Sequence, residues 1–446
     1  MKIHYQRSRG WLAALALLVF FFSLTVVAAA QAEEERPFAG TELNFIAQPD
    51  VFAEPVRRLL PRFEEETGIR VNMETLPYAS LRERQVSEFI AQGSAIDLMT
   101  MDIVWMGEYA EAGWIEPLGP YVERDVDAVQ PDDFLPGAMA GLALWDDEIF
   151  GMPLGAYYYL LHFRTDILEA AGLEPLDRPT LEETVNAIQQ TNNPPEVFGF
   201  SAGYRRAAPV VHDSLAYYIG LGGAVLADFP NDLSPNMNTE LAEETYEFYR
   251  DMLNYAPPGA ITFDFRERRE VFQQGRVAVH GSWSSSSAAF IDPRESVEEV
   301  TENVGFTYLP RADVDADPVV PFGGWALVIN TYSEQKDAAW EFIKWFSSPE
   351  IQLEYAADGG TPFRQSTLEN PELQADRPWY ELILQAEAEG WVRPEYRPRF
   401  PPWPRMEEEM GLYLSEAMAG ERSIPDALAI IDQEIESILQ DEGYLP

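Results

Sequence analysis

The sequence predicts an α/β fold divided into two domains. Apolar strands alternate with helices of ordinary length, which is the order that builds a parallel sheet covered by helices on both faces. The chain of 446 residues is longer than one hydrophobic core usually serves, so we expect two domains. Apolar residues make up 46% of the chain and aromatic residues 13%, which is ample material for two cores.

The first α/β unit begins near Thr41. A strand over residues 43–47 leads through a short loop into a helix over 52–67 that ends at Gly68. Ligands of such sheets bind outside the carboxyl ends of the strands, which is where Asp50, Tyr78 and Asp102 fall. The unit continues with a strand over 69–75, a helix over 79–91 and an apolar strand over 96–101.

A second α/β unit is expected in the middle of the chain, where Pro and Gly clusters separate the elements. Its helices are expected over 164–171, 180–190, 211–219 and 240–253, and its strands over 157–163, 197–200 and 277–280. Strands over 305–309 and 325–330 follow, then a helix over 336–346 with an aromatic face and helices over 404–418 and 424–439.

Residues 1–32 are typical of a secretory signal peptide. Three basic residues precede an apolar run from Trp11 to Val27, and small residues follow up to Ala32. We expect cleavage after Ala30 or Ala32 and export of the mature chain, with an uncleaved membrane anchor as the alternative. The chain contains no cysteine, which excludes disulfides, thiol chemistry and a lipidated N-terminal cysteine.

The charge is strongly acidic, with a formal net value of −44. Nucleic acid and anionic lipid are therefore repelled and are not expected as partners. Only Lys2, Lys336 and Lys344 are lysines, and arginine supplies the other basic residues. A surface rich in carboxylates repels itself in dilute buffer and is tolerated when salt screens it, which indicates adaptation to a saline medium; a basic partner is the alternative.

Several motifs are spread over nearly the whole mature chain. They are FEEETGIRV (63–71), IDLMTMDIVWMGEYAEAGWIEPL (96–118), FGMPLGAYYYLLHFRTDILEAAGL (150–173), FQQGRVAVHGSW (272–283), GGWALVIN (323–330), AAWEFIKWFSSPEIQ (338–352), GGTPFR (359–364) and YRPRFPPWPRM (396–406). Together they resemble one known family and stand in its order: the extracellular solute-binding proteins of bacterial ABC importers, in the carbohydrate-binding group that includes maltose- and trehalose-binding proteins.

The resemblance implies a two-lobed, type II-like periplasmic-binding-protein fold, hinged by crossing segments, that closes over its ligand. The crossings are expected near residues 151–154, 322–324 and 359–362. Lobe one is then 41–152 plus 323–360, and lobe two is 153–322 plus 361–446.

The resemblance also implies a monomeric, non-catalytic receptor without a cofactor or metal. It would capture a neutral sugar, short oligosaccharide or polyol and present it to the transmembrane subunits of an ABC permease. Because an exported receptor without a lipid tether needs an outer membrane to retain it, we expect the periplasm of a Gram-negative cell.

Sugars combine hydroxyls around the rim with apolar ring faces, so their sites combine planar hydrogen-bonding groups with aromatic rings. Asp102 and Trp105 follow the strand over 96–101 and supply both; the alternative is a helix cap and a core residue. By resemblance Trp283, after a buried strand, and Trp325, beside Gly324 at the second crossing, are the stacking tryptophans.

Six further positions are implied by resemblance. Arg397 matches an arginine that binds sugar hydroxyls, with Arg399 and Arg405 as rivals. Trp403 faces the cleft or packs beneath it, and Arg364 contacts ligand or forms a salt bridge between the lobes. The loops that carry contacts in relatives here contain Asp50, Tyr78 and Arg82.

One position departs from the family pattern. Where relatives tend to carry an aspartate at the first crossing, this chain has Tyr157. A phenol satisfies different hydroxyls from a carboxylate and adds a possible stacking face, so the identity of the sugar does not transfer.

Two other functions remain open. A carbohydrate-active enzyme would use paired carboxylates, but no G-x-S-x-G, H-E-x-x-H or P-loop motif is present, and His162 and His280 lie in or at the end of apolar strands. A receptor for a phosphorylated polyol or another anion would need converging basic groups, for which Arg82, Arg364 and Arg397 are candidates.

Overall fold

The computed structural model describes residues 36–49 and 51–446. The expected signal peptide at 1–32 and the candidate residue Asp50 lie outside this range. Within it, no helix is both long enough and apolar enough to cross a lipid bilayer.

The first α/β unit forms as the sequence predicts. Its three strands pair in parallel in the order β2-β1-β3, with Leu43 opposite Val71 and Phe45 opposite Leu98. Helix α2 ends at Gly68, which adopts a left-handed conformation (φ 76°) and donates its N–H to the carbonyl of Glu64. The elements are β1 (Glu42–Ala47), α2 (Ala53–Thr67), β2 (Arg70–Thr75), α3 (Tyr78–Ile90) and β3 (Leu98–Asp102).

Short helices and a hairpin connect this unit to the rest of the chain. They are α4 (Met106–Glu111), α5 (Gly119–Arg124), α6 (Val126–Val129), α7 (Pro136–Ala138), β4 (Leu144–Trp145) and β5 (Glu148–Ile149).

The second unit contains the expected elements, with boundaries shifted by a few residues. The helices are α8 (Thr165–Ala170), α9 (Leu181–Thr191), α10 (Ala208–Gly220), α11 (Glu240–Asp251), α12 (Phe265–Gln273), α13 (Ser287–Ile291) and α14 (Glu298–Asn303). The strands are β6 (Met152–Arg164), β7 (Phe198–Ser201), β8 (Leu226–Asp228), β9 (Asp232–Pro235), β10 (Val277–Trp283) and β11 (Val304–Tyr308).

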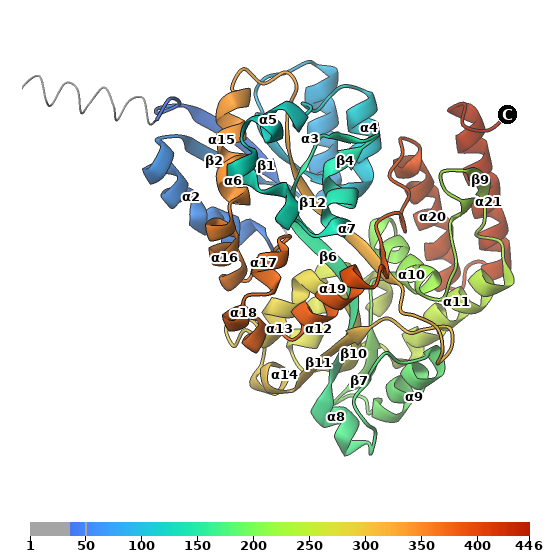
Figure 1. Cartoon of the computed structure of the whole chain (residues 1–446). Coiled ribbons are helices and arrows are strands. Elements are labelled where there is room, and N and C mark those ends of the chain that lie inside the picture. Colours follow the sequence, from blue (N-terminus) through green and yellow to red (C-terminus); the bar gives the residue numbers. More distant parts are fainter. Residues whose placement is uncertain (1–35, 50) are drawn as a thin grey trace, which may run out of the picture.

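The remainder consists of one long strand, a short strand and seven helices. Helices α20 and α21 pack against each other and against α10 and α11, on the right of Figure 1. The elements are β12 (Val320–Ile329), α15 (Lys336–Ser347), α16 (Pro349–Ala357), α17 (Gln365–Leu368), α18 (Pro371–Asp376), α19 (Trp379–Ala388), β13 (Val392–Arg393), α20 (Trp403–Met418) and α21 (Ile424–Asp441).

The main sheet is mixed and runs through both lobes, in the order β2-β1-β3-β12-β6-β10-β7. Strand β12 is antiparallel to β3 and β6, and β6 is antiparallel to β10 and β11. The parallel pairs are those among β1–β3, the β7–β10 pair and, off the main path, the short β13 beside β12. Figure 1 shows β6 and β12 running between the upper and lower groups of elements.

Both connecting strands begin earlier than the sequence predicts. Strand β6 starts at Met152 rather than at residue 157, and β12 starts at Val320 rather than at residue 325. Every residue of the two strands is buried, so neither shows the alternation of apolar and polar residues that marks a strand boundary. Two of the three expected crossings, near 151–154 and 322–324, lie in or next to these strands.

Candidate functional site

A cavity of about 520 Å³ lies at the carboxyl ends of β3 and β10, beside the middle of β12. This is a typical size for a small-molecule site. Seven of the twelve residues that the sequence proposes line it: Tyr78, Asp102, Tyr157, Trp283, Gly324, Trp325 and Arg397. The loop before Asp50 also lines it, through Gln48 and Pro49.

The pairing of β12 with β3 and with β6 brings several of these lining residues together. Trp325 lies opposite Asp102 in the β12–β3 register, and Gly324 lies opposite Ala156 in the β12–β6 register. Gly324 has a φ of 135°, and a Cβ there would lie 2.1 Å from the carbonyl oxygen of Gly155, so only glycine fits. The close approach of β6 and β12 therefore depends on this glycine.

Trp283 is the last residue of β10, and its indole packs beside Gly323 of the connecting strand β12. A Cβ added to Gly323 would meet the Trp283 indole at 3.0 Å, so the missing side chain makes room for the ring. The guanidinium of Arg397 lies 5.9 Å from the ring centroid of Trp283, and the ring of Tyr159 packs against its edge at 5.0 Å. The indole is thereby held at the cavity wall.

Asp102 and Arg397 form a charged pair inside the cavity. Arg397 Nη2 lies 3.6 Å from Asp102 Oδ1, and both side chains are almost fully buried. Burial raises the pKa of Asp102 and the positive charge of Arg397 opposes that rise. Asp102 also accepts a hydrogen bond from the Val104 N–H at 3.2 Å, so it caps the following turn and lines the cavity at once.

Arg397 contacts a buried polar network that the sequence did not reveal. Its Nη1 lies 2.8 Å from His212 Nε2, which lies 2.8 Å from Glu407 Oε1. Burial works to raise the pKa of Glu407, but His212 and Arg397 together bring it below its ordinary value. A carboxylate at Glu407 thus supports the guanidinium that faces the cavity.

Two candidate tryptophans lie beneath the cavity rather than at its wall. Trp105 is fully buried against the rings of Tyr78 and Trp325, at centroid distances of 5.0 and 5.8 Å. Trp403 is fully buried and donates its Nε1–H to Glu407 at 3.2 Å. A packed indole is the alternative to ligand contact that the sequence left open at both positions.

Two candidate arginines are paired with carboxylates outside the cavity lining. Arg82 Nη2 lies 2.6 Å from Glu108 Oε2. Arg364 is fully buried and lies 2.9 Å from Asp133 Oδ2. Asp133 and Arg364 fall in different expected lobes, and a salt bridge between the lobes is the alternative to ligand contact that the sequence left open for this arginine.

The cavity contains five arginines that sequence reasoning missed, and we refer to them as the arginine wall. Arg205 and Arg206 precede α10, and the other three belong to the first turns of α12. The signals were the dipeptide at 205–206 and the run RERR at 266–269, which stand out in so acidic a chain. The arginine wall consists of Arg205, Arg206, Arg266, Arg268 and Arg269.

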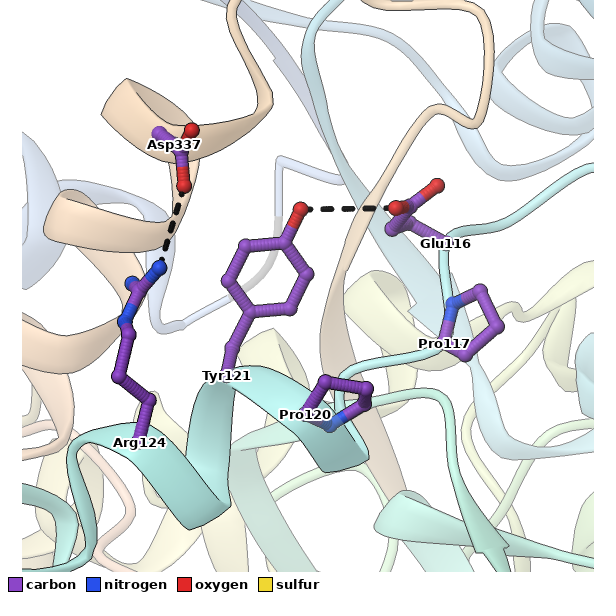
Figure 2. Close-up of a pocket in the computed structure, with 6 residues that line it drawn as sticks. All are labelled: Glu116, Pro117, Pro120, Tyr121, Arg124 and Asp337. Atoms are coloured by element: carbon purple, nitrogen blue, oxygen red, sulfur yellow. Dashed lines mark hydrogen bonds and ion pairs between the residues drawn. The ribbon is translucent and has the colours of Figure 1, made fainter.

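A second hollow, of about 390 Å³, lies between α5 and the start of α15 (Figure 2). Its polar groups already bind one another: Tyr121 donates to Glu116 at 3.4 Å, and Arg124 donates to Asp337 at 3.3 Å. Two prolines complete the lining. Because no free polar group converges there among those that line it, the cavity beside β12 is the better candidate site.

No group of three or more His, Cys, Asp or Glu side chains in the described part of the chain is arranged to hold a metal ion. His162 and His280 are fully buried, face each other across β6 and β10, and lie outside the cavity lining. Burial lowers the pKa of His162 to about 3.

Comparison with known proteins gives consistent matches. Residues 49–353 match the family model of bacterial extracellular solute-binding proteins. A solute-binding protein of an ABC transporter from Agrobacterium radiobacter, solved with ribitol, is 30% identical, with a TM-score of 0.84 over 90% of this chain and 99% of that one.

Two curated relatives cover most of both chains. A mannitol-binding protein of Pseudomonas aeruginosa is 25% identical over 87% of this chain and 91% of its own length. A probable amino-acid ABC transporter periplasmic-binding protein of Sinorhizobium fredii is 24% identical over 99% of this chain and its whole length.

Proposed function

Since this chain belongs to the bacterial extracellular solute-binding proteins, we propose that it captures a sugar, short oligosaccharide or polyol in the cavity beside β12 and delivers it to an ABC permease. The observation that carries the proposal is the convergence of Trp283 and Trp325 with the Asp102–Arg397 pair in one cavity. The relatives that bind ribitol and mannitol support a polyhydroxylated ligand.

The chemistry of the cavity suits such a ligand. The two indoles offer apolar faces for C–H groups, and the carboxylate and guanidinium offer acceptors and donors for neighbouring hydroxyls. Tyr78 and Tyr157 add aromatic surface at the same cavity. A neutral carbohydrate needs no perturbed acid for this, so we propose binding without catalysis.

We propose as ligand-contacting residues those that line the cavity: Tyr78, Asp102, Tyr157, Trp283, Gly324, Trp325 and Arg397. Asp50 remains a proposal from sequence alone. Trp105, Trp403, Arg82 and Arg364 are proposed to act through packing and ion pairs, since none of them lines the cavity.

Closure of the lobes over the ligand is proposed as the signal to the permease. The boundaries proposed are 41–152 plus 323–360 for lobe one and 153–322 plus 361–446 for lobe two. A ligand that contacts both lobes only in the closed form shifts the population of the protein toward that closed form. The positive φ of Gly324 and Gly359 supports hinges at two of the crossings.

We propose that the mature, monomeric protein works in the periplasm of a Gram-negative cell in a saline medium, after removal of residues 1–32. The basic and apolar character of the first 27 residues, the lack of cysteine and the acidic composition support this.

The test is calorimetric titration of the mature protein with ribitol, mannitol, maltose and a set of amino acids. We expect a sugar or polyol to bind, and Trp283→Ala or Trp325→Ala to weaken that binding at least about tenfold, or about 1.4 kcal/mol. Trp345→Ala is the matched control. This half-buried indole lies on the surface of α15 and donates a hydrogen bond to Glu66 of α2, so its removal should leave the affinity unchanged. Binding of amino acids alone, or full affinity in both cavity variants, would contradict the proposal.

A further inference from the structure

The arginine wall gives the cavity a charge opposite to that of the whole chain. Six arginines, counting Arg397, line the cavity together with only two aspartates, although the chain carries a formal net charge of −44. A neutral polyol needs donors and acceptors but no surplus of positive charge. The excess of guanidinium groups therefore calls for a separate explanation.

Three members of the wall are already neutralised. Arg205 lies 2.7 Å from Asp264, Arg266 lies 2.7 Å from Glu270, and Arg268 lies 3.1 Å from the fully buried Asp213. Arg268 also donates to the carbonyl of Gly281. These three arginines are fixed by protein partners and have less capacity for a ligand.

Arg206 and Arg269 are different. Within residues 36–49 and 51–446, neither forms an ion pair with a carboxylate, although Asp or Glu is abundant throughout the chain. The Nε of Arg269 is buried and has no hydrogen-bond partner. Leaving a buried donor unpaired is costly, so a ligand acceptor at this position would be stabilising.

The start of helix α10 adds to the positive character of the same wall. Ala208 and Pro209, in its first turn, line the cavity, and no side chain caps this end of the helix. Ala207 before it holds a φ of 79°, a strained conformation for a residue with a side chain. Thirteen residues of helix thus direct their uncapped N-terminus, which attracts anions, toward the cavity.

We propose that Arg206 and Arg269 form a subsite for an anionic group, a carboxylate or a phosphate, carried by the sugar or polyol. The inference rests on the proposed function: the hydroxylated part of the ligand occupies the side of Trp283, Trp325 and Asp102, and the anion lies against the two arginines. A neutral polyol still binds, and its anionic derivative binds more tightly because it forms charge-assisted hydrogen bonds in addition.

The test compares ribitol with ribonate and ribitol 5-phosphate by calorimetry at one ionic strength, set with sodium chloride. We expect at least one of the two anions to bind about tenfold or more tightly than ribitol. Arg206→Gln and Arg269→Gln should each reduce this advantage several-fold while changing the Kd of ribitol less than twofold. Arg266→Gln is the matched control, because it removes the same charge from the same wall but from an arginine that is already paired with Glu270.

The pattern across the two anions identifies the group. An advantage for both indicates a subsite that accepts a carboxylate or a phosphate, and an advantage for one alone identifies the group that the subsite requires. If ribitol binds as tightly as both anions, or if the advantage persists in both variants, the subsite does not exist and the proposed function stands without it.

A second measurement keeps the two proposals separate. Inorganic phosphate alone, against chloride at equal ionic strength, should raise the Tm of the parent and not that of the double variant R206Q/R269Q. Stabilisation by phosphate with no binding of any sugar or polyol would retain the anion subsite and overturn the proposed ligand class. Absence of this stabilisation in the parent counts against the subsite.

Discussion

Replacing Arg364 by methionine is expected to destabilise the fold by about 3–5 kcal/mol and to leave the affinity for ligand within twofold. The side chain is fully buried, and its guanidinium donates to the carbonyls of Ser347 (2.7 Å), Gln130 (3.3 Å) and Val129 and to the carboxylate of Asp133 (2.9 Å). It also lies 4.7 Å from the ring centroid of Phe134.

The magnitude follows from what the methionine leaves behind. Each buried acceptor without a partner costs about 1–3 kcal/mol, and the buried carbonyls of Ser347 and Val129 lose the guanidinium as donor. The carbonyl of Gln130 keeps the N–H of Asp133. Asp133 keeps its bonds to Ser366 and is partly reached by solvent, which limits the total to the range for a broken buried ion pair.

Urea unfolding followed by tryptophan fluorescence measures the stability, and calorimetric titration measures the affinity. The matched control is Arg58→Met, which breaks the exposed Arg58–Asp358 pair and should cost less than about 1 kcal/mol. If Arg364→Met is as stable as this control, or if it loses tenfold in affinity without losing stability, the structural role of Arg364 is refuted.

Two further predictions concern stability in solution. His162 has a pKa of about 3 when folded and about 6.5 when unfolded, so it contributes no penalty above pH 6.5 and an increasing one as the pH falls toward 3. By pH 5.5 protonation of His162 alone should lower the free energy of unfolding by about 1.4 kcal/mol. Between pH 8 and pH 5.5, urea unfolding should therefore show a correspondingly smaller loss of stability for His162→Gln than for the parent. Equal losses in the two proteins would exclude His162 as the origin. Salt should raise the Tm of the parent between 0.1 and 2 M sodium chloride, because it screens repulsion among the carboxylates; an unchanged Tm would argue against adaptation to a saline medium.

Candidate residues next to a strand end were placed well by sequence reasoning. Asp102 is the last residue of β3 and Trp283 the last of β10, and both line the cavity. Their position follows from local pattern, because an apolar run ending in a polar or aromatic residue marks the carboxyl edge where ligands bind. The same reasoning located Tyr78 at the start of α3.

The sequence did not distinguish residues that pair with a distant side chain from residues that contact the ligand. Arg364 pairs with Asp133 and Trp403 bonds to Glu407, and nothing near either residue in the sequence distinguishes these bonds from contact with a sugar. Arg82 likewise pairs with Glu108 of another helix. A charged or aromatic side chain in a suitable loop is compatible with both roles until its neighbours are known.

The sequence by itself determined the α/β class, the family and most strand and helix positions, because these depend on local periodicity and on motifs in order. The tertiary structure decided which side chains share the cavity. The register of β12 on β3 and β6 brings Trp325 to Asp102, and the starts of α10 and α12 assemble the arginine wall from segments about sixty residues apart. The charge of the cavity arises from such long-range packing, and a net charge of −44 gives no indication of it.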